Sequence, residues 1–191
     1  MAEFLTFIRH TLTEAKPGIC YGESDVALAG TYRNDMNRVL KKLKPYQPQF
    51  IVSSPLKRCK KLASLIEKHY QLPFQIDDRI KEASFGEWEL KPWNDINRSN
   101  LIDWTKNYVN IPPPGGESFN MVLDRFDPFW NELWQKEEKE IFVVTHNGIL
   151  RTALVKALNL TPRQVFSFNL SFGAVIRIKK VEPGFYSLQI L

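Results

Sequence analysis

Two of the three histidines in the sequence directly follow short apolar runs that are typical of β-strands. Residues 4–8 form the first run, and Arg9 and His10 come immediately after it. Residues 141–145 form another run, which ends at His146. In open α/β sheets, ligands bind beyond the carboxyl ends of the strands. We therefore expect Arg9, His10 and His146 to lie at one edge of a sheet, where they can meet the same ligand.

Other polar groups expected at this edge would suit an anion. The apolar run 50–52 leads towards Ser54, and Arg58 lies one turn into the helix that is expected to follow. Arginine holds a phosphate through two parallel hydrogen bonds, which lysine cannot do. A protonated His146 would add a further cation. The free backbone N–H groups of a helix that starts at Asn147 would also bind an anion.

Phosphoryl transfer through a histidine is the chemistry that fits these residue types. A neutral imidazole, here His10, attacks phosphorus and becomes phosphorylated, which divides one difficult step into two easier ones. Cations must meet the negative charge on the phosphoryl oxygens. A carboxylic acid must protonate the leaving oxygen and later take a proton from the attacking water. Glu82 is an attractive carboxylate because it follows the predicted strand 74–76, although spacing alone does not single it out.

Rival reaction types lack their sequence motifs. The chain has no GxxxxGK[ST] loop to hold a nucleotide, and residues 22–26 lack the closing glycine of a GxSxG serine nucleophile. Neither Cys20 nor Cys59 is followed by the arginine that a cysteine phosphatase needs six residues later. No HExxH motif or close His/Asp cluster indicates a metal site. We expect the chemistry to use no metal and no cofactor.

The composition is that of a soluble globular protein. The chain has 191 residues, of which 43% are hydrophobic and 25% charged, with a net charge of +5. Two cysteines, no secretory signal and no apolar run long enough to span a bilayer predict a cytoplasmic protein. The positive charge favours an anionic ligand, but no nucleic-acid-binding motif is present. We expect a small-molecule phosphate ester as the partner, with no nucleic acid and no membrane; the oligomeric state is open.

The elements that would hold these residues alternate between strands and helices. This order predicts an α/β fold, a three-layer α/β/α sandwich with a mostly parallel central sheet and an antiparallel edge. Ser54 is expected to cap the second helix with Pro55 at its first position, and Ser118 to cap the helix after the insertion. The expected strands are 4–8, 50–52, 74–76, 141–146, 175–178 and 185–188, and the expected helices are 32–44, 54–69, 118–133 and 147–158.

A tryptophan-rich segment, 85–117, interrupts this alternation. It carries Trp88, Trp93 and Trp104 in a polar stretch and ends in a proline-glycine run at 111–116. We expect a single domain over residues 1–191 in which segment 85–117 is a small lid-like insertion over the active site.

Five segments, in the same order along the chain, resemble motifs of the histidine phosphatase superfamily, also called phosphoglycerate-mutase-like. They are Phe7–Thr11, Ser53–Cys59, Ile80–Glu89, Pro114–Ser118 and Val143–Arg151. The resemblance implies an α/β fold and hydrolysis of phosphate monoesters through a phosphohistidine.

The same resemblance implies a role for each matching residue. His10 corresponds to the nucleophile and Glu82 to the proton donor, whereas Arg9, Arg58 and His146 correspond to the phosphate pocket. Two positions depart from the family pattern, since Thr11 and Asn147 stand where glycines are usual. Both add side chains near the expected phosphate.

Residues 17–25 are similar to the α-ribazole phosphatase branch of that superfamily. The resemblance implies removal of the 5′-phosphate from α-ribazole phosphate or a cobamide phosphate during assembly of the lower loop of cobalamin. Tyr21 and Gly22 would then contact the substrate. The flat rings of Tyr21, Trp88 and Trp93 could stack on a dimethylbenzimidazole-like base, or the tryptophans could pack within the protein.

Other functions remain open at this point. A broad-specificity or sugar-phosphate phosphatase would use the same mechanism. A cofactor-dependent mutase is less favoured because the chain is short and the insertion small. A phosphate-recognition module without turnover would need Arg9, Arg58 and His146 but not Glu82. A nucleic-acid-binding protein is indicated only by the sequence pI of about 9.2.

Overall fold

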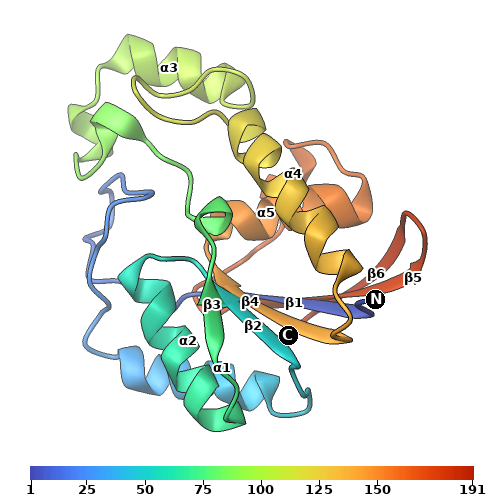
Figure 1. Ribbon diagram of the computed structural model, residues 1–191. Coiled ribbons are helices and arrows are strands. Elements are labelled where there is room, and N and C mark those ends of the chain that lie inside the picture. Colours follow the sequence, from blue (N-terminus) through green and yellow to red (C-terminus); the bar gives the residue numbers. More distant parts are fainter.

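The computed structural model describes all 191 residues, which form one β-sheet with helices on both faces (Figure 1). The strands are β1 (Phe4–Arg9), β2 (Phe50–Ser53), β3 (Phe74–Ile76), β4 (Glu140–Thr145), β5 (Val175–Glu182) and β6 (Phe185–Ile190). The helices are α1 (Tyr32–Leu43), α2 (Lys57–Tyr70), α3 (Arg98–Asn107), α4 (Phe119–Gln135) and α5 (Asn147–Leu158). The pair α1 and α2 covers one face and the pair α4 and α5 the other, which confirms the three-layer α/β/α sandwich. None of these helices combines the length and apolar character needed to cross a membrane.

The sheet has the strand order β3-β2-β4-β1-β5-β6. Strands β1 to β4 run parallel, whereas β5 pairs antiparallel with β1 and β6 antiparallel with β5, as predicted. Arg9 at the end of β1 is paired with Thr145 at the end of β4, so His10 and His146 leave the sheet side by side. Strand β2 pairs with the other edge of β4 and leads into Ser54. Three neighbouring parallel strands therefore deliver polar residues to one place.

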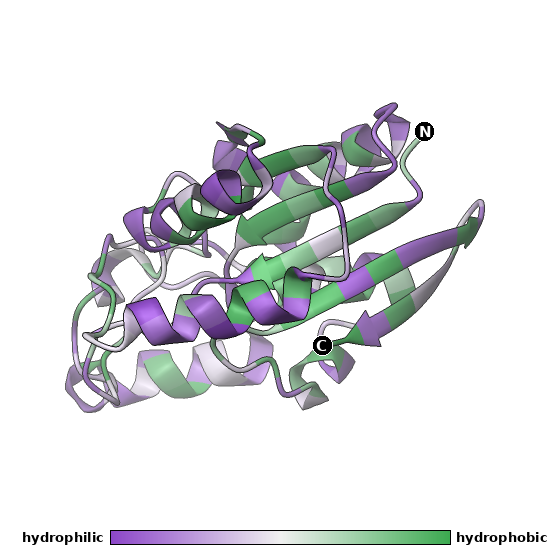
Figure 2. Ribbon diagram, turned by 90° about the horizontal axis from the view of Figure 1, so that it is seen from below, coloured by the Kyte–Doolittle hydropathy of each residue, from purple (hydrophilic) through white to green (hydrophobic).

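Two apolar cores hold these strand ends in position. On one side, Leu5 and Phe7 of β1 pack with Phe126 of α4, and on the other Ile8 packs with Leu62 of α2. Figure 2 shows hydrophobic residues concentrated in the strands and hydrophilic residues on the outward faces of the helices. The side chains of Leu5, Phe7, Ile8, Leu62 and Phe126 are fully buried. Burying a side chain of this size contributes about 1.5–3 kcal/mol to stability, so the sheet edge is a rigid base for a site.

The prediction for the helix start is confirmed at Ser118 and wrong at Ser54. Ser118 caps α4, because its Oγ accepts a hydrogen bond from the N–H of Met121 at 3.3 Å. Helix α2, in contrast, begins at Lys57, and its N-cap is the extended residue Leu56. The Ser54 hydroxyl lies 2.7 Å from Nε2 of His146 and also accepts a longer bond, 3.4 Å, from the N–H of Leu56, so it serves the turn before α2 and the histidine rather than the helix itself.

Segment 85–117 extends away from the sheet and contains α3 together with two short 3₁₀ helices (Figure 1). Its aromatic side chains pack on one another: the rings of Trp93 and Trp104 stack with centroids 6.0 Å apart, and Phe85 meets both edge to face. Trp88 is 5% exposed and belongs to the small core under this segment. Of the ring-stacking candidates, Trp88 is therefore a packing residue.

Candidate active site

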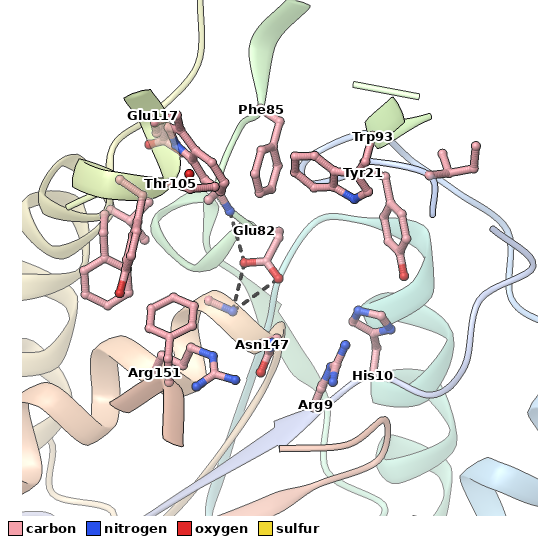
Figure 3. A pocket seen from close by; sticks show the side chains of 18 residues that line it. Arg9, His10, Tyr21, Glu82, Phe85, Trp93, Thr105, Glu117, Asn147 and Arg151 are labelled. Carbon is pink, nitrogen blue, oxygen red and sulfur yellow. Dashed lines mark hydrogen bonds between the residues drawn. The ribbon is translucent and has the colours of Figure 1, made fainter. Parts of the chain in front are cut away.

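A cavity of about 550 Å³ lies between the carboxyl ends of β1 and β4 and segment 85–117. Arg9, His10 and Asn147 face it from the sheet edge, with Glu82 beside them and Phe85 and Trp93 opposite (Figure 3). The other lining residues are Ile19, Tyr21, Ala83, Trp104, Thr105, Tyr108, Glu117, Phe119, Val122, Gly148, Arg151 and Phe166. The cavity thus has a polar floor at the sheet and a largely aromatic wall.

His10 is buried, and its ring is oriented by a contact between Nδ1 and the backbone oxygen of Thr11 at 2.8 Å. A carbonyl oxygen can only accept, so Nδ1 carries the proton and Nε2 keeps its lone pair. Burial, together with the positive charges of Arg58 and Arg9, lowers the pKa of His10 well below 6.5. His10 is therefore a neutral imidazole with one unprotonated nitrogen at neutral pH.

Arg58 and His146 are buried next to His10 but do not line the cavity. The ring centroids of His10 and His146 are 5.1 Å apart, and the Arg58 side chain is 1% exposed. Nε of Arg58 donates to Nδ1 of His146 at 3.3 Å, so the proton of His146 resides on Nε2 and is donated to Ser54 Oγ.

His146 is neutral in this arrangement, so it does not supply the further cation that a protonated ring would add. Burial, and then the neighbouring His10 and Arg58, lower the pKa of His146 well below 6.5. A nitrogen that accepts from a guanidinium cannot also carry a proton, so geometry and electrostatics agree. Arg58 is the cation of this buried pair, and His146 is its neutral acceptor rather than a further positive charge.

Glu82 lies at the N-terminus of α5. Its two carboxylate oxygens accept from the N–H of Gly148 at 3.0 and 3.2 Å, and Oε1 also accepts from the N–H of Ala83 at 3.1 Å. A Cβ on Gly148 would lie 2.3 Å from Oε1, so this contact requires a glycine. At the helix end that we expected to bind an external anion, the N–H of Gly148 thus already binds a carboxylate of the protein itself.

Arg9 and Asn147 line the cavity and retain unused hydrogen-bonding groups. Nη1 of Arg9 donates to the backbone oxygen of Leu170 at 2.5 Å, and the guanidinium lies 4.0 Å from the ring centroid of Phe172. Nε of Arg9 and Oδ1 of Asn147 have no partner within the protein, and neither does the hydroxyl of Thr11. Both residues that replace family glycines thus bring an unpaired polar atom to the neighbourhood of His10.

Tyr21 and Gly22, the two loop residues expected at the substrate, have different surroundings. Tyr21 lines the cavity, with its hydroxyl 2.9 Å from that of Thr13. Gly22 does not line the cavity. Its N–H donates to Glu89 at 3.0 Å, and its carbonyl accepts from Arg58. Its lack of a side chain serves packing, since a Cβ there would lie 1.9 Å from a backbone oxygen.

Arg151 is a cavity residue to which the sequence analysis assigned no role. It lines the cavity on the far side of Asn147 from Arg9 (Figure 3) and donates a hydrogen bond to the backbone oxygen of Val165. Its guanidinium lies 4.4 Å from the ring centroid of Phe166. The sequence signal for this role is the spacing from Asn147, because Arg151 lies four residues later and residues four apart on a helix share a face.

The structure contains no group of three or more His, Cys, Asp or Glu side chains placed to hold a metal ion.

The depressed histidine pKa values predict that stability depends on pH. As the pH falls below about 6.5, His10 and His146 take up protons in the unfolded chain but remain neutral in the folded one, so the folded state loses stability. We expect the free energy of unfolding to decrease between about pH 7 and about pH 5 in urea titrations. His10→Asn should weaken this dependence, whereas His69→Gln, at an exposed position on α2, should leave it unchanged. Equal slopes for the wild type and His10→Asn would contradict the assigned state of His10.

Comparison with known proteins identifies the family. Residues 5–189 match the model of the histidine phosphatase superfamily (branch 1). The chain is 24% identical to the adenosylcobalamin/α-ribazole phosphatase of Escherichia coli (strain K12), over 98% of this chain and 94% of that protein.

Two solved structures have the same fold. The α-ribazole phosphatase from Shigella flexneri aligns with a TM-score of 0.89 at 23% identity, covering 98% of this chain and 95% of that one. A mycobacterial glucosyl-3-phosphoglycerate phosphatase aligns with a TM-score of 0.88 at 21% identity, covering 100% and 98%. Because the family model matches nearly the whole chain, the protein belongs to the histidine phosphatase superfamily, branch 1.

Proposed function

We propose that the protein hydrolyses phosphate monoesters through a phosphohistidine formed at Nε2 of His10. The observation that carries the proposal is the state of this ring. Its Nδ1 is bound to a backbone oxygen at 2.8 Å and its pKa is held well below 6.5 by burial and by nearby arginines, which leaves Nε2 unprotonated. Such an imidazole is a nucleophile at neutral pH without a separate base to activate it.

The residues around His10 support a two-step reaction. In the first step, a bond forms between Nε2 of His10 and phosphorus while the bond from phosphorus to the leaving oxygen breaks. Glu82, in its acid form, gives its proton to that oxygen. In the second step, water attacks phosphorus, the P–N bond breaks, and Glu82 takes the proton of the water. The cycle releases inorganic phosphate and restores neutral His10 and protonated Glu82.

Arg9 and Arg58 are proposed to stabilise the transferring group. Arg9 faces the cavity, and Arg58 is close enough to lower the pKa of His10. Their positive charges would meet the phosphoryl oxygens in surroundings from which water is largely excluded, where such charges act most strongly. Glu82 distinguishes an enzyme from a phosphate-recognition module, because binding alone gives no reason to place a carboxylate beside a phosphate.

A trapping experiment tests the nucleophile. With a radiolabelled aryl phosphate, we expect an acid-labile, base-stable phosphoenzyme in the wild type and none in His10→Ala, with turnover reduced by about a thousandfold or more. Glu82→Gln should slow turnover while inorganic phosphate still binds. Undiminished label in His10→Ala would refute the assignment. A wild type that binds phosphate but hydrolyses no ester would be a recognition module.

Gly148→Ala tests the placement of Glu82 without altering its chemistry. The added Cβ would lie 2.3 Å from Oε1 and so displace the carboxylate, and we expect kcat to fall by about 10- to 100-fold. The displaced atom ends a flexible side chain, so Tm should change little. Gly30→Ala is the matched control, because nothing lies within 4 Å of a Cβ there. The same kcat in both variants would argue against a role for Glu82.

For the substrate, we infer a phosphate ester with a flat aromatic group, with α-ribazole 5′-phosphate or a cobamide phosphate as the first candidate. Ten of the 18 residues that line the cavity are hydrophobic, and Tyr21, Phe85, Trp93 and Trp104 offer ring faces and edges to a bound base. The similarity to the Escherichia coli adenosylcobalamin/α-ribazole phosphatase supports the same choice. The likeness to the glucosyl-3-phosphoglycerate phosphatase supports a sugar-phosphate substrate as the alternative.

Substrate competition separates these two classes. We expect kcat/KM for α-ribazole 5′-phosphate to exceed that for sugar phosphates by about tenfold or more. Trp93→Ala should reduce only the value for the aromatic substrate, by about two- to tenfold, because it removes a stacking surface. Higher kcat/KM for sugar phosphates, unaffected by Trp93→Ala, would favour the alternative.

A further inference from the structure

A backbone turn at residues 22–24 donates its hydrogen bonds to one carboxylate, that of Glu89. The N–H groups of all three turn residues donate to it, at 3.0, 3.1 and 3.1 Å. The N–H of Phe85 donates to the same carboxylate at 2.9 Å. Glu89 thus joins the turn to the start of segment 85–117, far away in sequence.

The opposite side of the same turn faces Arg58. The carbonyl oxygens of Gly22 and Ser24 accept from Nη2 and Nη1 of Arg58 at 2.5 and 2.7 Å. The Nε–H of the same guanidinium donates to Nδ1 of His146 at 3.3 Å. A guanidinium has five N–H bonds, so these contacts leave two for a phosphate oxygen. No carboxylate contacts Arg58 directly.

The electrostatics of this arrangement are cooperative. The peptide group between Gly22 and Glu23 directs its N–H towards the Glu89 carboxylate and its carbonyl towards Arg58, so each charge polarises this group in the sense that strengthens the other contact. Burial acts to raise the pKa of Glu89, but hydrogen bonds from Gly22, Ser24 and Phe85 outweigh it and the pKa lies below its usual value. Glu89 is therefore an anion at neutral pH.

We propose that Glu89 is a positioning residue that acts through turn 22–24 to hold the Arg58 guanidinium beside His10 and His146. Without the carboxylate, three N–H groups lose their acceptor, and the two carbonyls that fix Arg58 are free to move. Glu89 itself does not line the cavity, so it acts on a ligand through the groups that it holds in place, among which Arg58 carries the positive charge. The kinetic consequences rest on the proposed function, whereas the positioning itself does not.

Glu89→Gln tests the proposal, because an amide places N–H donors against the N–H groups of the turn. We expect kcat/KM for an aryl phosphate to fall by about 10- to 100-fold, and the inhibition constant of orthovanadate to rise with it. The effect should nearly disappear in an Arg58→Lys background, since residues that act through one another are not additive. Independent of activity, the slowly exchanging Nε–H signal of Arg58 in ¹⁵N NMR, assigned by its loss in Arg58→Lys, should exchange faster in Glu89→Gln.

Glu140→Gln provides the matched control for a general loss of stability. Glu140 is also a buried carboxylate with several donors, Thr6 and Arg177, but it lies at the opposite end of β4 from His146. Glu140→Gln should lower Tm and leave the Arg58 Nε–H signal and the orthovanadate inhibition constant unchanged. If Glu89→Gln does not fold, Glu89→Asp, which keeps the charge but shortens the reach, replaces it in every comparison.

Two results would overturn the proposal. One is a double variant, Glu89→Gln with Arg58→Lys, whose loss of kcat/KM equals the product of the two single losses. The other is an unchanged Arg58 Nε–H signal in Glu89→Gln. A wild type without phosphatase activity would refute the proposed function instead, and the NMR comparison would still decide the positioning role.

Discussion

Arg58 carries a positive charge in a place that is closed to water, and the active-site region is organised around that charge. Burying an isolated ion is costly unless hydrogen bonds replace its hydration. Here two carbonyl oxygens and a neutral imidazole do so, and no carboxylate neutralises the charge at short range. The positive charge therefore persists beside His10, where, after burial, it helps to keep the pKa of the imidazole low and the ring neutral, and it adds to the attraction for an anion. A direct ion pair would satisfy Arg58 equally well but would cancel both effects.

The sheet supplies the base for this arrangement. Because β2, β4 and β1 are neighbouring parallel strands, residues that are more than a hundred positions apart in sequence meet at their carboxyl ends. The same edge receives Glu82 on the N–H of Gly148 in the first turn of α5, and segment 85–117 lines the cavity with aromatic rings. Under the proposed function, phosphate chemistry and leaving-group recognition use different walls of the cavity. Such a division is consistent with a superfamily in which one reaction serves several substrates.

Sequence interpretation missed two contacts for the same reason. Ser54 has the sequence context of a helix cap, yet its hydroxyl contacts His146, and α2 begins three residues later. The start of α5 has the character of an anion site, and the Gly148 N–H there already binds the carboxylate of Glu82. In each case the local pattern identified a group able to make a hydrogen bond, and a partner distant in sequence then took that group. Elements with strong periodicity, such as helix α4, were predicted well because the apolar residues that bury one face of a helix recur at a regular spacing in the sequence.

By itself, the sequence determined the order of strands and helices, the sandwich architecture and the set of polar residues that the sheet edge brings together. These follow from apolar periodicity, turn residues and motif order, which are encoded along the chain. Only the tertiary structure decided the state of that set: His146 neutral rather than charged, Gly22 packed against the backbone, Trp88 buried, and Arg151 added to the cavity. The physical reason is that charge state depends on burial and on the nearest partners, and in a parallel sheet those partners come from distant parts of the chain.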